Sequence, residues 1–494
     1  MKNNLTFNIN IIDYFKHTKP TALKKLLIIF LALLLSSYLG YGITIFPLGF
    51  RAALALVVAI LLYIQWGSFG FLCGLVALAP LDWEGFNFFG RIPLLGSIFP
   101  EAGIRPRFVI LIGGIYIFYK LIEALRSKKL PHFFPFIPII LIGVFGALSG
   151  FVFALQLGSY NSNWYVGYIL HGLIMFSVVY LMVNNLRQAK ILFICLIITG
   201  IFFSIIAKML PSSIVLLDNN VQNGWSQGDY RLSGIWLLPL GFQIFANPIF
   251  ISTYMAFSSI LAWGMYLFSK NNFIKAVLLA VIGLMTYVNL TTVSRTGLYG
   301  LLIGVAFITF IYMLNVNWKS RLIVITSIIS LSIVIVISYS IFLNTSSGGS
   351  IVNRLYGLQE NSQIRVDLIT QSLNLSLHNP MGEGPEALLV AASVPQHSLH
   401  TMLLAGLGWF GYLALILLIF WCIKPLLRFN KANSDIFELQ LSLLGVFLAV
   451  FIMGFGHSFL DTTWGTVLFW GSLGLAATIN KLGQRKLIVG ETIH

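Results

Sequence analysis

The stretch LHTMLLAGLGWFGYLALILLIFWCI, residues 399–423, contains no Asp, Glu, Lys or Arg. A helix needs about 20 apolar residues to cross the hydrocarbon core of a membrane, and this stretch is long enough to do so. The composition of the whole chain agrees: of 494 residues, 58% are hydrophobic and 9% are charged, and the mean hydropathy is +0.90. Because a soluble domain carries roughly a quarter charged residues, the sequence predicts a polytopic membrane protein.

Similar apolar stretches recur along the chain. The windows that predict membrane helices lie near residues 26–46, 107–124, 134–156, 164–183, 189–209, 247–268, 274–292, 297–315, 321–343, 399–423, 437–456 and 464–480. The stretch 50–81 is broken at Gln65–Gly67, so it forms either two short crossings or one re-entrant pair. We therefore expect an all-α polytopic membrane protein with 12–14 transmembrane helices and a helical periplasmic loop.

Lysine and arginine residues gather in every second connection. The basic segments are RSKK (126–129), Arg187 with Lys190, Lys270 with Lys275, Lys319 with Arg321, and KPLLRFNK (424–431). Basic residues of short loops remain on the cytoplasmic side, so we expect these connections and both termini to be cytoplasmic. The opposite side then holds two long loops, at about 210–246 and 344–397.

The formal charge of +15 separates by side in this topology. The cytoplasmic side carries 16 Lys and 5 Arg with 5 acids, whereas the outer side carries 8 Arg and 1 Lys with 10 acids. The net charge therefore reports orientation and requires no nucleic-acid partner. Because arginine binds phosphate bidentately, the outer arginines indicate a phosphate-bearing ligand. The alternative is that they pair with the outer acids or extend to lipid headgroups.

Two outer segments combine arginine with helix and turn signals. Residues 361–389 predict an amphipathic helix with Arg365 near its start and a His-Asn-Pro stop followed by a Gly-rich turn. Its leucines should face the membrane surface or the helix bundle, namely Leu368, Leu373, Leu375 and Leu377. In NLTTVSRTGLYGLLIG (289–304), Arg295 interrupts two apolar spans with almost no loop. A charge near the membrane is costly unless it is paired or functional; an arginine that extends to the interface is the alternative.

Histidines mark a third outer segment, PQHSLHTMLLAGLGWFGYLALI (395–416). His397 stands where the loop meets a membrane helix, and His400 shares a helix face with it. Histidine titrates near neutrality and can accept a proton from an alcohol, although either residue could simply stand at a helix end. The sequence contains no HExxH motif or cysteine-ligand pattern, so we expect no metal site. The scarcity of ionisable residues at mid-membrane positions argues against an ion-coupled transporter.

These segments together resemble the O-antigen ligase and O-antigen polymerase superfamily. The shared features are Arg365 in a loop helix, the PMGEG turn (380–384), His397 eleven residues before Gly408, SRTG (294–297), and RLSG…NP (231–248). Two positions depart from the family pattern: Ser398 stands where Asn usually follows the histidine, and Gly297 comes one place later than in SRG. The resemblance covers about residues 229–420.

The resemblance implies a metal-independent glycosyltransferase without a cofactor, in the bacterial inner membrane. Its donor would be an undecaprenyl-pyrophosphate-linked glycan on the periplasmic side, and direct displacement would invert the anomeric configuration. His397 would act as the base, and Arg365 and Arg295 would stabilise the departing pyrophosphate. The expected substrate-binding residues are Arg231, His400, Arg354 and Glu383.

Three functions stay open at this point. The first is an O-antigen ligase of lipopolysaccharide biosynthesis with a lipid A–core acceptor, and the second is an O-antigen or exopolysaccharide polymerase that joins lipid-linked repeat units. The third is a transporter or accessory protein of bicarbonate or polysaccharide export. We divide the chain into a cytoplasmic tail (1–25), an N-terminal membrane region (26–228), a ligase-like catalytic region (229–420, with loop 344–397) and C-terminal helices with a cytoplasmic tail (421–494).

Overall fold

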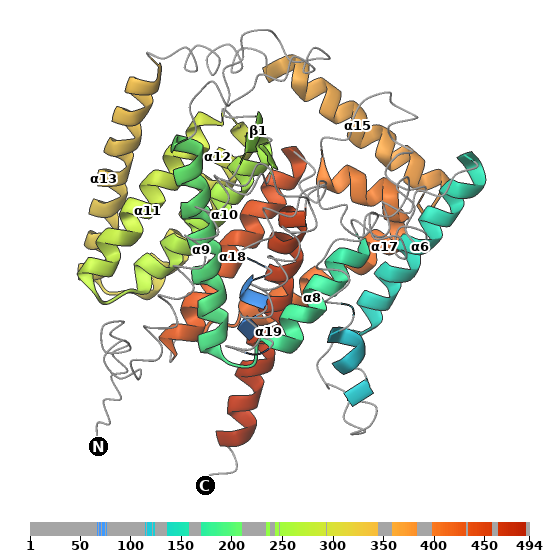
Figure 1. Ribbon diagram of the computed structural model, residues 1–494, viewed down its shortest axis with the longest axis horizontal. Coiled ribbons are helices and arrows are strands. Elements are labelled where there is room, and N and C mark those ends of the chain that lie inside the picture. Colours follow the sequence, from blue (N-terminus) through green and yellow to red (C-terminus); the bar gives the residue numbers. More distant parts are fainter. Residues whose placement is uncertain are drawn as a thin grey trace, which may run out of the picture.

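The chain is helical almost wherever the structure describes it (Figure 1). The computed structural model describes residues 67–76 and 114–123 in part, and residues 136–157, 169–209, 234–237, 243–246, 248–292, 294–343, 358–382, 398–430, 433–456 and 463–490. The helices are α6 (Phe136–Leu157), α8 (His171–Met182), α9 (Leu186–Met209), α10 (Pro248–Phe268), α11 (Asn272–Thr291), α12 (Arg295–Asn315), α13 (Trp318–Leu343), α15 (Leu358–His378), α17 (Leu399–Leu426), α18 (Ser434–Gly456) and α19 (Thr463–Gly490).

The prediction of an all-helical polytopic membrane protein is confirmed. Within the described ranges, six helical segments are long and apolar enough to cross a membrane: Leu186–Ile205, Ile251–Phe268, Asn272–Thr291, Arg295–Asn315, Leu399–Leu426 and Ser434–Gly456. Three shorter apolar segments accompany them, at Ile137–Ser149, His171–Met182 and Gly465–Ile479. The predicted spans at 26–46, 50–81 and 107–124 lie wholly or largely outside the described residues.

Most helix limits agree with the predicted windows, and the exceptions are instructive. α10 begins at Pro248, directly after Asn247, because the fixed φ angle of proline suits the first position of a helix. α8 lies within the window at 164–183, whose first residues are outside the described part of the chain, and α19 continues ten residues beyond the window at 464–480, to Gly490. Hydropathy alone therefore locates a helix better than it locates its ends.

A β-hairpin precedes α10 and was not predicted. Strands β1 (Gly234–Leu237) and β2 (Gln243–Ala246) pair antiparallel, with Gly234 opposite Ala246 and Leu237 opposite Gln243. The hairpin lies within the expected outer loop at 210–246, so it adds local structure to this loop and leaves the membrane region helical.

Helices α10 and α18 form the centre of the bundle. α10 packs against α9, α11, α12 and α18, and α18 also contacts α17 and α19. Trp263 of α10 is fully buried, and its Nε1 donates to Thr309 Oγ1 of α12 over 2.9 Å. The helices packed around α10 and α18 therefore hold these two central helices in place.

Glycines let α12 approach both central helices closely. A Cβ atom on Gly297 would overlap Ser252 of α10, and one on Gly300 would stand 2.5 Å from Met453 Cγ of α18. A Cβ on Gly304 would stand 2.5 Å from Ile260 Cδ1 of α10 and 3.1 Å from the Gly445 carbonyl oxygen of α18. Small residues at helix interfaces are typical of membrane proteins, in which packing replaces the hydrophobic effect as the main force between helices.

The outward faces of the peripheral helices carry large apolar side chains. Exposed examples are Ile137 and Ile140 of α6, Leu302 and Phe310 of α12, and Leu417 and Phe420 of α17. In water, surfaces of this kind promote aggregation, whereas lipid chains solvate them. The distribution agrees with a multi-pass protein whose helices face lipid.

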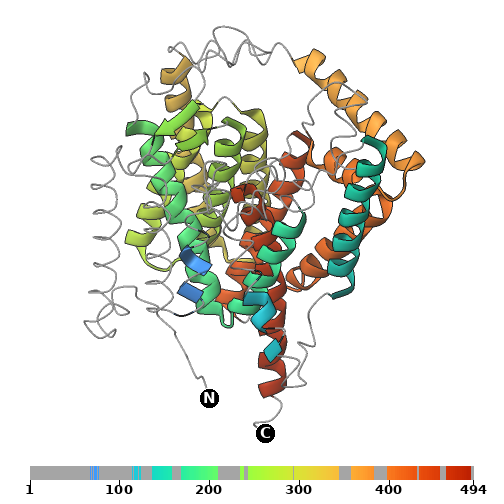
Figure 2. The same ribbon diagram turned by 45° about the vertical axis from the view of Figure 1, so that its right-hand side comes forward.

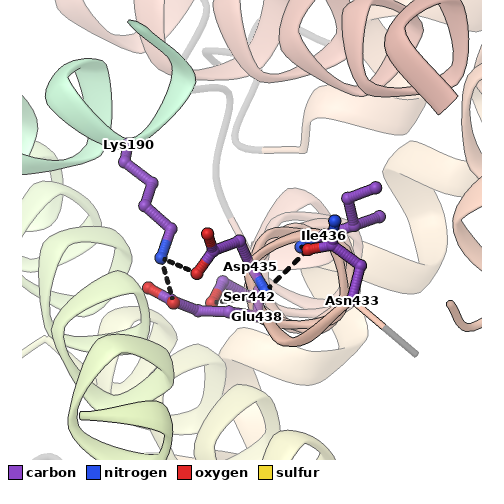
Figure 3. A network of polar contacts seen from close by, with 6 residues as sticks. All are labelled: Lys190, Asn433, Asp435, Ile436, Glu438 and Ser442. Carbon is purple, nitrogen blue, oxygen red and sulfur yellow. Dashed lines mark hydrogen bonds and ion pairs between the residues drawn. The ribbon is translucent and has the colours of Figure 1, made fainter. Parts of the chain in front are cut away.

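The basic connections gather at one end of the bundle. Lys190, near the start of α9, donates to Asp435 Oδ1 over 2.8 Å and to Glu438 Oε2 over 2.7 Å, both in the first turns of α18 (Figure 3). At the same end, Tyr312 of α12 donates to the Leu267 carbonyl of α10 over 2.9 Å, and Phe268 packs against Phe437. The helix ends beside 187–190, 270–275, 319–321 and 424–431 are therefore neighbours, as the alternating charge pattern predicts.

We expect the Lys190–Glu438 pair to be the main polar link between α9 and α18. The side chain of Glu438 is 8% exposed, against 40% for Asp435. Removing one partner of a buried ion pair is destabilising, and without Glu438 the Lys190 ammonium keeps only the more exposed Asp435. Glu438→Ala should therefore lower the thermal unfolding temperature in detergent sharply, whereas Asp435→Ala should cost less than about 1 kcal/mol.

A double variant separates charge burial from packing. Lys190→Met combined with Glu438→Leu removes both charges, so it should recover most of the stability that Glu438→Ala loses. Equal losses in the Asp435 and Glu438 variants, or a double variant as unstable as Glu438→Ala, would contradict this assignment.

Candidate functional site

The connection between α11 and α12 is a tight polar turn. Thr292 Oγ1 donates to the Asn289 carbonyl oxygen over 2.6 Å and accepts from the Ser294 backbone N–H over 3.2 Å. Ser294 is the N-cap residue of α12, with extended backbone angles, and Arg295 is the first helical residue. The sequence predicted Arg295 at a turn between two spans; the structure places it at the beginning of the second helix.

This turn contains polar atoms without a partner. Among the described residues, Asn289 Nδ2, Ser294 Oγ and Arg295 Nη1 are buried and have no hydrogen-bond partner. Asn289 is fully buried, Ser294 is 5% exposed, and Arg295 is half-buried. Buried polar groups are normally hydrogen-bonded, and a group left alone costs about 1–3 kcal/mol. Three such atoms in one turn indicate a place where another molecule supplies the acceptors.

The turn is fixed from two sides. Ser252 of α10 donates from Oγ to Asn289 Oδ1 over 2.7 Å, and the same serine lies directly against Gly297 in the first turn of α12. On the other side, the space next to Gly456, the last residue of α18, is filled by Thr296 of α12. Arg295 is therefore attached to a rigid part of the bundle.

The start of α17 lies against the same end of α18. Ser398 is the N-cap of α17, where its Oγ accepts from the Thr401 N–H at 3.5 Å and donates to the Gly454 carbonyl oxygen at 3.2 Å. Serine and asparagine are comparable N-caps, so serine supplies the capping that asparagine would supply at this position. The last turn of α18 thus separates the beginning of α12 from the beginning of α17.

His400 is held by two hydrogen bonds within the protein. Its Nε2 lies 3.0 Å from the Phe451 carbonyl oxygen, which can only accept, so Nε2 carries the proton. Its Nδ1 lies 3.3 Å from the hydroxyl of Tyr412, which donates to it. Phe451 and Phe455 pack against the ring, with centroid distances of 4.9 and 4.4 Å. A substrate contact by His400 stays a prediction, while its observed bonds connect α17 to α18.

A break in α17 makes the contact between His400 and Tyr412 possible. Twelve residues of a straight helix span about 18 Å, too far for these two side chains to meet. Gly408, between them, has φ of +65° and interrupts the helix. The break is packed against the turn after α15: a Cβ on Gly408 would overlap Pro380 and Gly382, and one on Gly382 would overlap Gly406 and Gly408. The first residues of the PMGEG turn therefore touch Gly408, and both belong to the sequence motif.

Helix α15 lies across this end of the bundle, above the first part of α17 (Figures 1 and 2). Its fully buried side chains on the α17 side are Ser372 and Ser376, and Ser376 Oγ contacts the Leu404 carbonyl at 3.2 Å. The leucines were expected to face either the membrane surface or the helix bundle; Leu373 and Leu377 are exposed, together with Val366 and Ile369, so these two do not face the bundle. Serines occupy the interface because they permit close approach, and the exposed apolar stripe faces away from α17.

The structure describes three of the seven predicted site residues. Arg295 and His400 lie on either side of the last turn of α18, beside Gly456 and Gly454 respectively. Arg365 lies in α15, at the same end of the bundle. The remaining predicted site residues, which lie outside the described residues, are His397, Arg231, Arg354 and Glu383.

Two residues of this site were missed in the sequence. Asn289 is an uncharged polar residue at the end of an apolar span, and such a residue is only weak sequence evidence for a functional site. Tyr412 lies in the middle of an apolar helix, and only the break at Gly408 brings it to His400. Over the described ranges, no group of three His, Cys, Asp or Glu side chains is arranged to hold a metal ion.

We expect Gly408→Ala to disturb this end of the bundle. The residue has φ of +65° and ψ of −176°, a backbone region that is essentially restricted to glycine, and backbone atoms of Pro380 and Gly382 lie in the place of the new methyl group. Thermal unfolding of the variant should occur well below that of the wild type. Gly283→Ala is the matched control, because its Cβ would meet nothing within 4 Å; an equal loss in both variants would contradict the assignment.

No protein-family model matches the chain, and no curated protein matches it either.

Proposed function

We propose that this protein transfers a glycan from an undecaprenyl-pyrophosphate donor to an acceptor hydroxyl, as an O-antigen ligase does. The observation that carries the proposal is the buried Nη1 of Arg295, which has no partner among the described residues. A guanidinium group at the end of a membrane helix bundle needs an anion. The pyrophosphate of a lipid-linked sugar is an anion that reaches a protein from within the membrane.

The arrangement suits the departure of a pyrophosphate. Attack by the acceptor oxygen on the anomeric carbon breaks the bond to the pyrophosphate oxygen, and the leaving group takes the bonding electrons. Positive groups fixed beforehand stabilise the charge that develops there. Arg295 begins α12, so its guanidinium group and the positive end of the helix dipole act at the same place. Arg365, in the helix above, is the second proposed cation.

A base should accept the proton of the attacking hydroxyl. The chain places His397 directly before Ser398, the N-cap of α17. This proposal is supported by the position of α17, whose start lies one turn of α18 away from the start of α12. We therefore assign the base role to His397 and give His400 the additional task of holding the start of α17 in place.

The proposed location is the bacterial inner membrane, with the site on the periplasmic side. The lysine-rich connections lie at the end opposite to Arg295, and basic connections favour the cytoplasmic side. In this orientation Arg295, α15 and the start of α17 meet a donor whose glycan has already crossed the membrane.

A reconstituted assay with purified protein tests the proposal. A lipid-pyrophosphate glycan is supplied with either lipid A–core or a second lipid-linked repeat unit as acceptor. A product with lipid A–core alone supports the ligase function, and a product with the repeat unit alone makes the protein a polymerase. Absence of product with both acceptors would overturn the proposal in favour of transport.

Arg295→Lys should lower the transfer rate by about 10²-fold, as the loss of one preorganised donor does elsewhere. Lysine keeps the charge and loses the planar fork that binds two phosphate oxygens at once. Arg365→Lys should lose activity for the same reason. Arg428→Lys, exposed at the opposite end, is the matched control and should remain fully active. Full activity of both Arg295→Lys and Arg365→Lys would remove the argument from arginine geometry.

Transfer should also continue in the presence of a strong chelator, because arginines take the place of a metal ion in the proposed mechanism. The measurement compares initial rates before and after addition of EDTA. Loss of activity that a divalent ion restores would exclude the metal-independent mechanism.

A further inference from the structure

The α11–α12 turn contains other unpaired polar groups besides Arg295. Asn289 Nδ2 and Ser294 Oγ are buried without partners among the described residues, and both are neutral hydrogen-bond donors. The sequence motif shared with the ligase superfamily gives no role to Asn289. Its burial is complete, so the absence of a partner is costly and calls for an explanation.

The N-cap residue of α12, Ser294, does not cap the helix with its side chain. Serine is among the best N-cap residues because its oxygen normally accepts from a first-turn N–H. Ser294 has the extended backbone of an N-cap, yet its side chain makes no such bond. The first backbone bond of the helix joins the Leu298 N–H to the Ser294 carbonyl at 3.4 Å. The N–H groups of Arg295, Thr296 and Gly297 therefore have no partner within the helix.

Ser252 connects the asparagine to this helix end. Its hydroxyl donates to Asn289 Oδ1, which turns Nδ2 of the amide away from that bond, and the same hydroxyl lies against Gly297. A larger residue at position 297 would displace Ser252 and with it the amide. The orientation of Asn289 is thus maintained by α10 and α12 together.

We propose that Asn289 Nδ2 and Ser294 Oγ, with Arg295 and the first-turn N–H groups of α12, form one binding site for the oxygens of a diphosphate. Helix N-termini bind phosphate through their N–H groups and dipole. Here the cation Arg295 and two neutral donors, Asn289 Nδ2 and Ser294 Oγ, add hydrogen bonds to those of the helix N-terminus. The identity of the ligand as a lipid diphosphate rests on the proposed function, whereas the anion site rests on the contacts described above.

Asn289→Asp is the sharpest variant. The carboxylate has the shape of the amide and retains the acceptor for Ser252, but it replaces the free N–H₂ donor with a negatively charged oxygen. Thermal unfolding checks that the variant is folded, and the negative charge should repel an anion. Asn315→Asp, at the other end of α12, is the matched control; Asn315 Nδ2 already donates to the Ile311 carbonyl over 2.6 Å.

The experiment titrates inorganic pyrophosphate into the full-length protein in neutral detergent and follows binding by calorimetry. Asn289→Asp should weaken binding at least tenfold and Ser294→Ala several-fold, while Asn315→Asp should bind like the wild type. Unchanged affinity in a folded Asn289→Asp protein, or no binding by the wild type, would overturn the inference. A second titration contains phosphatidylglycerol: if this lipid displaces pyrophosphate, the site belongs to a phospholipid headgroup and the diphosphate assignment fails.

Failure of this inference is distinguishable from failure of the proposed function. A protein that binds pyrophosphate through Asn289 and transfers no glycan in the reconstituted assay keeps the anion site and loses the transferase role. A protein that transfers glycan equally well with Asn289→Asp retains the transferase role and refutes the part assigned to Asn289.

Discussion

An unpaired guanidinium nitrogen at the end of a membrane helix bundle is the constraint around which this structure is best understood. Burying a polar group without a partner costs free energy, and the cost is greater for a charged group. Arg295, Ser294 and Asn289 all leave polar atoms unpaired in one turn, among the residues that the structure describes. Keeping these polar atoms unpaired lowers the stability of the fold. Such a cost is common at sites where a bound ligand completes the hydrogen bonds.

The rest of the bundle holds this turn in place. The glycines of α12 allow it to lie against both α10 and α18, and the Ser252–Asn289 bond ties α10 to the end of α11. At the other end, Lys190 joins α9 to the start of α18. α18 therefore has charged partners at its first turns, and at its last turn it lies between the beginnings of α12 and α17. Its two ends thus have different chemistry, in agreement with a protein that presents opposite ends to different compartments.

Hydropathy and charge predicted the helices and the grouping of their basic connections, because both follow from the cost of placing charge in lipid. The stop of α15 at His378–Asn379–Pro380 followed from turn chemistry. The orientation of α15 was left open between the membrane surface and the bundle; in the structure Leu373 and Leu377 are exposed, and the buried serines Ser372 and Ser376 lie on the α17 side. The roles of Asn289 and Tyr412 could not be predicted from the sequence. The first depends on a bond to Ser252 of α10, and the second on the break in α17 that brings Tyr412 to His400.

Photo-crosslinking tests the central claim most directly. A polyprenyl-diphosphate glycan that carries a diazirine next to the diphosphate is added to the purified full-length protein, and the labelled peptides are identified by mass spectrometry. The account predicts labelling in residues 289–304, around Arg295, and in the start of α17 near Ser398. Labelling confined to the opposite end, around Lys190 and Asp435, or labelling that excess pyrophosphate fails to reduce, would contradict it.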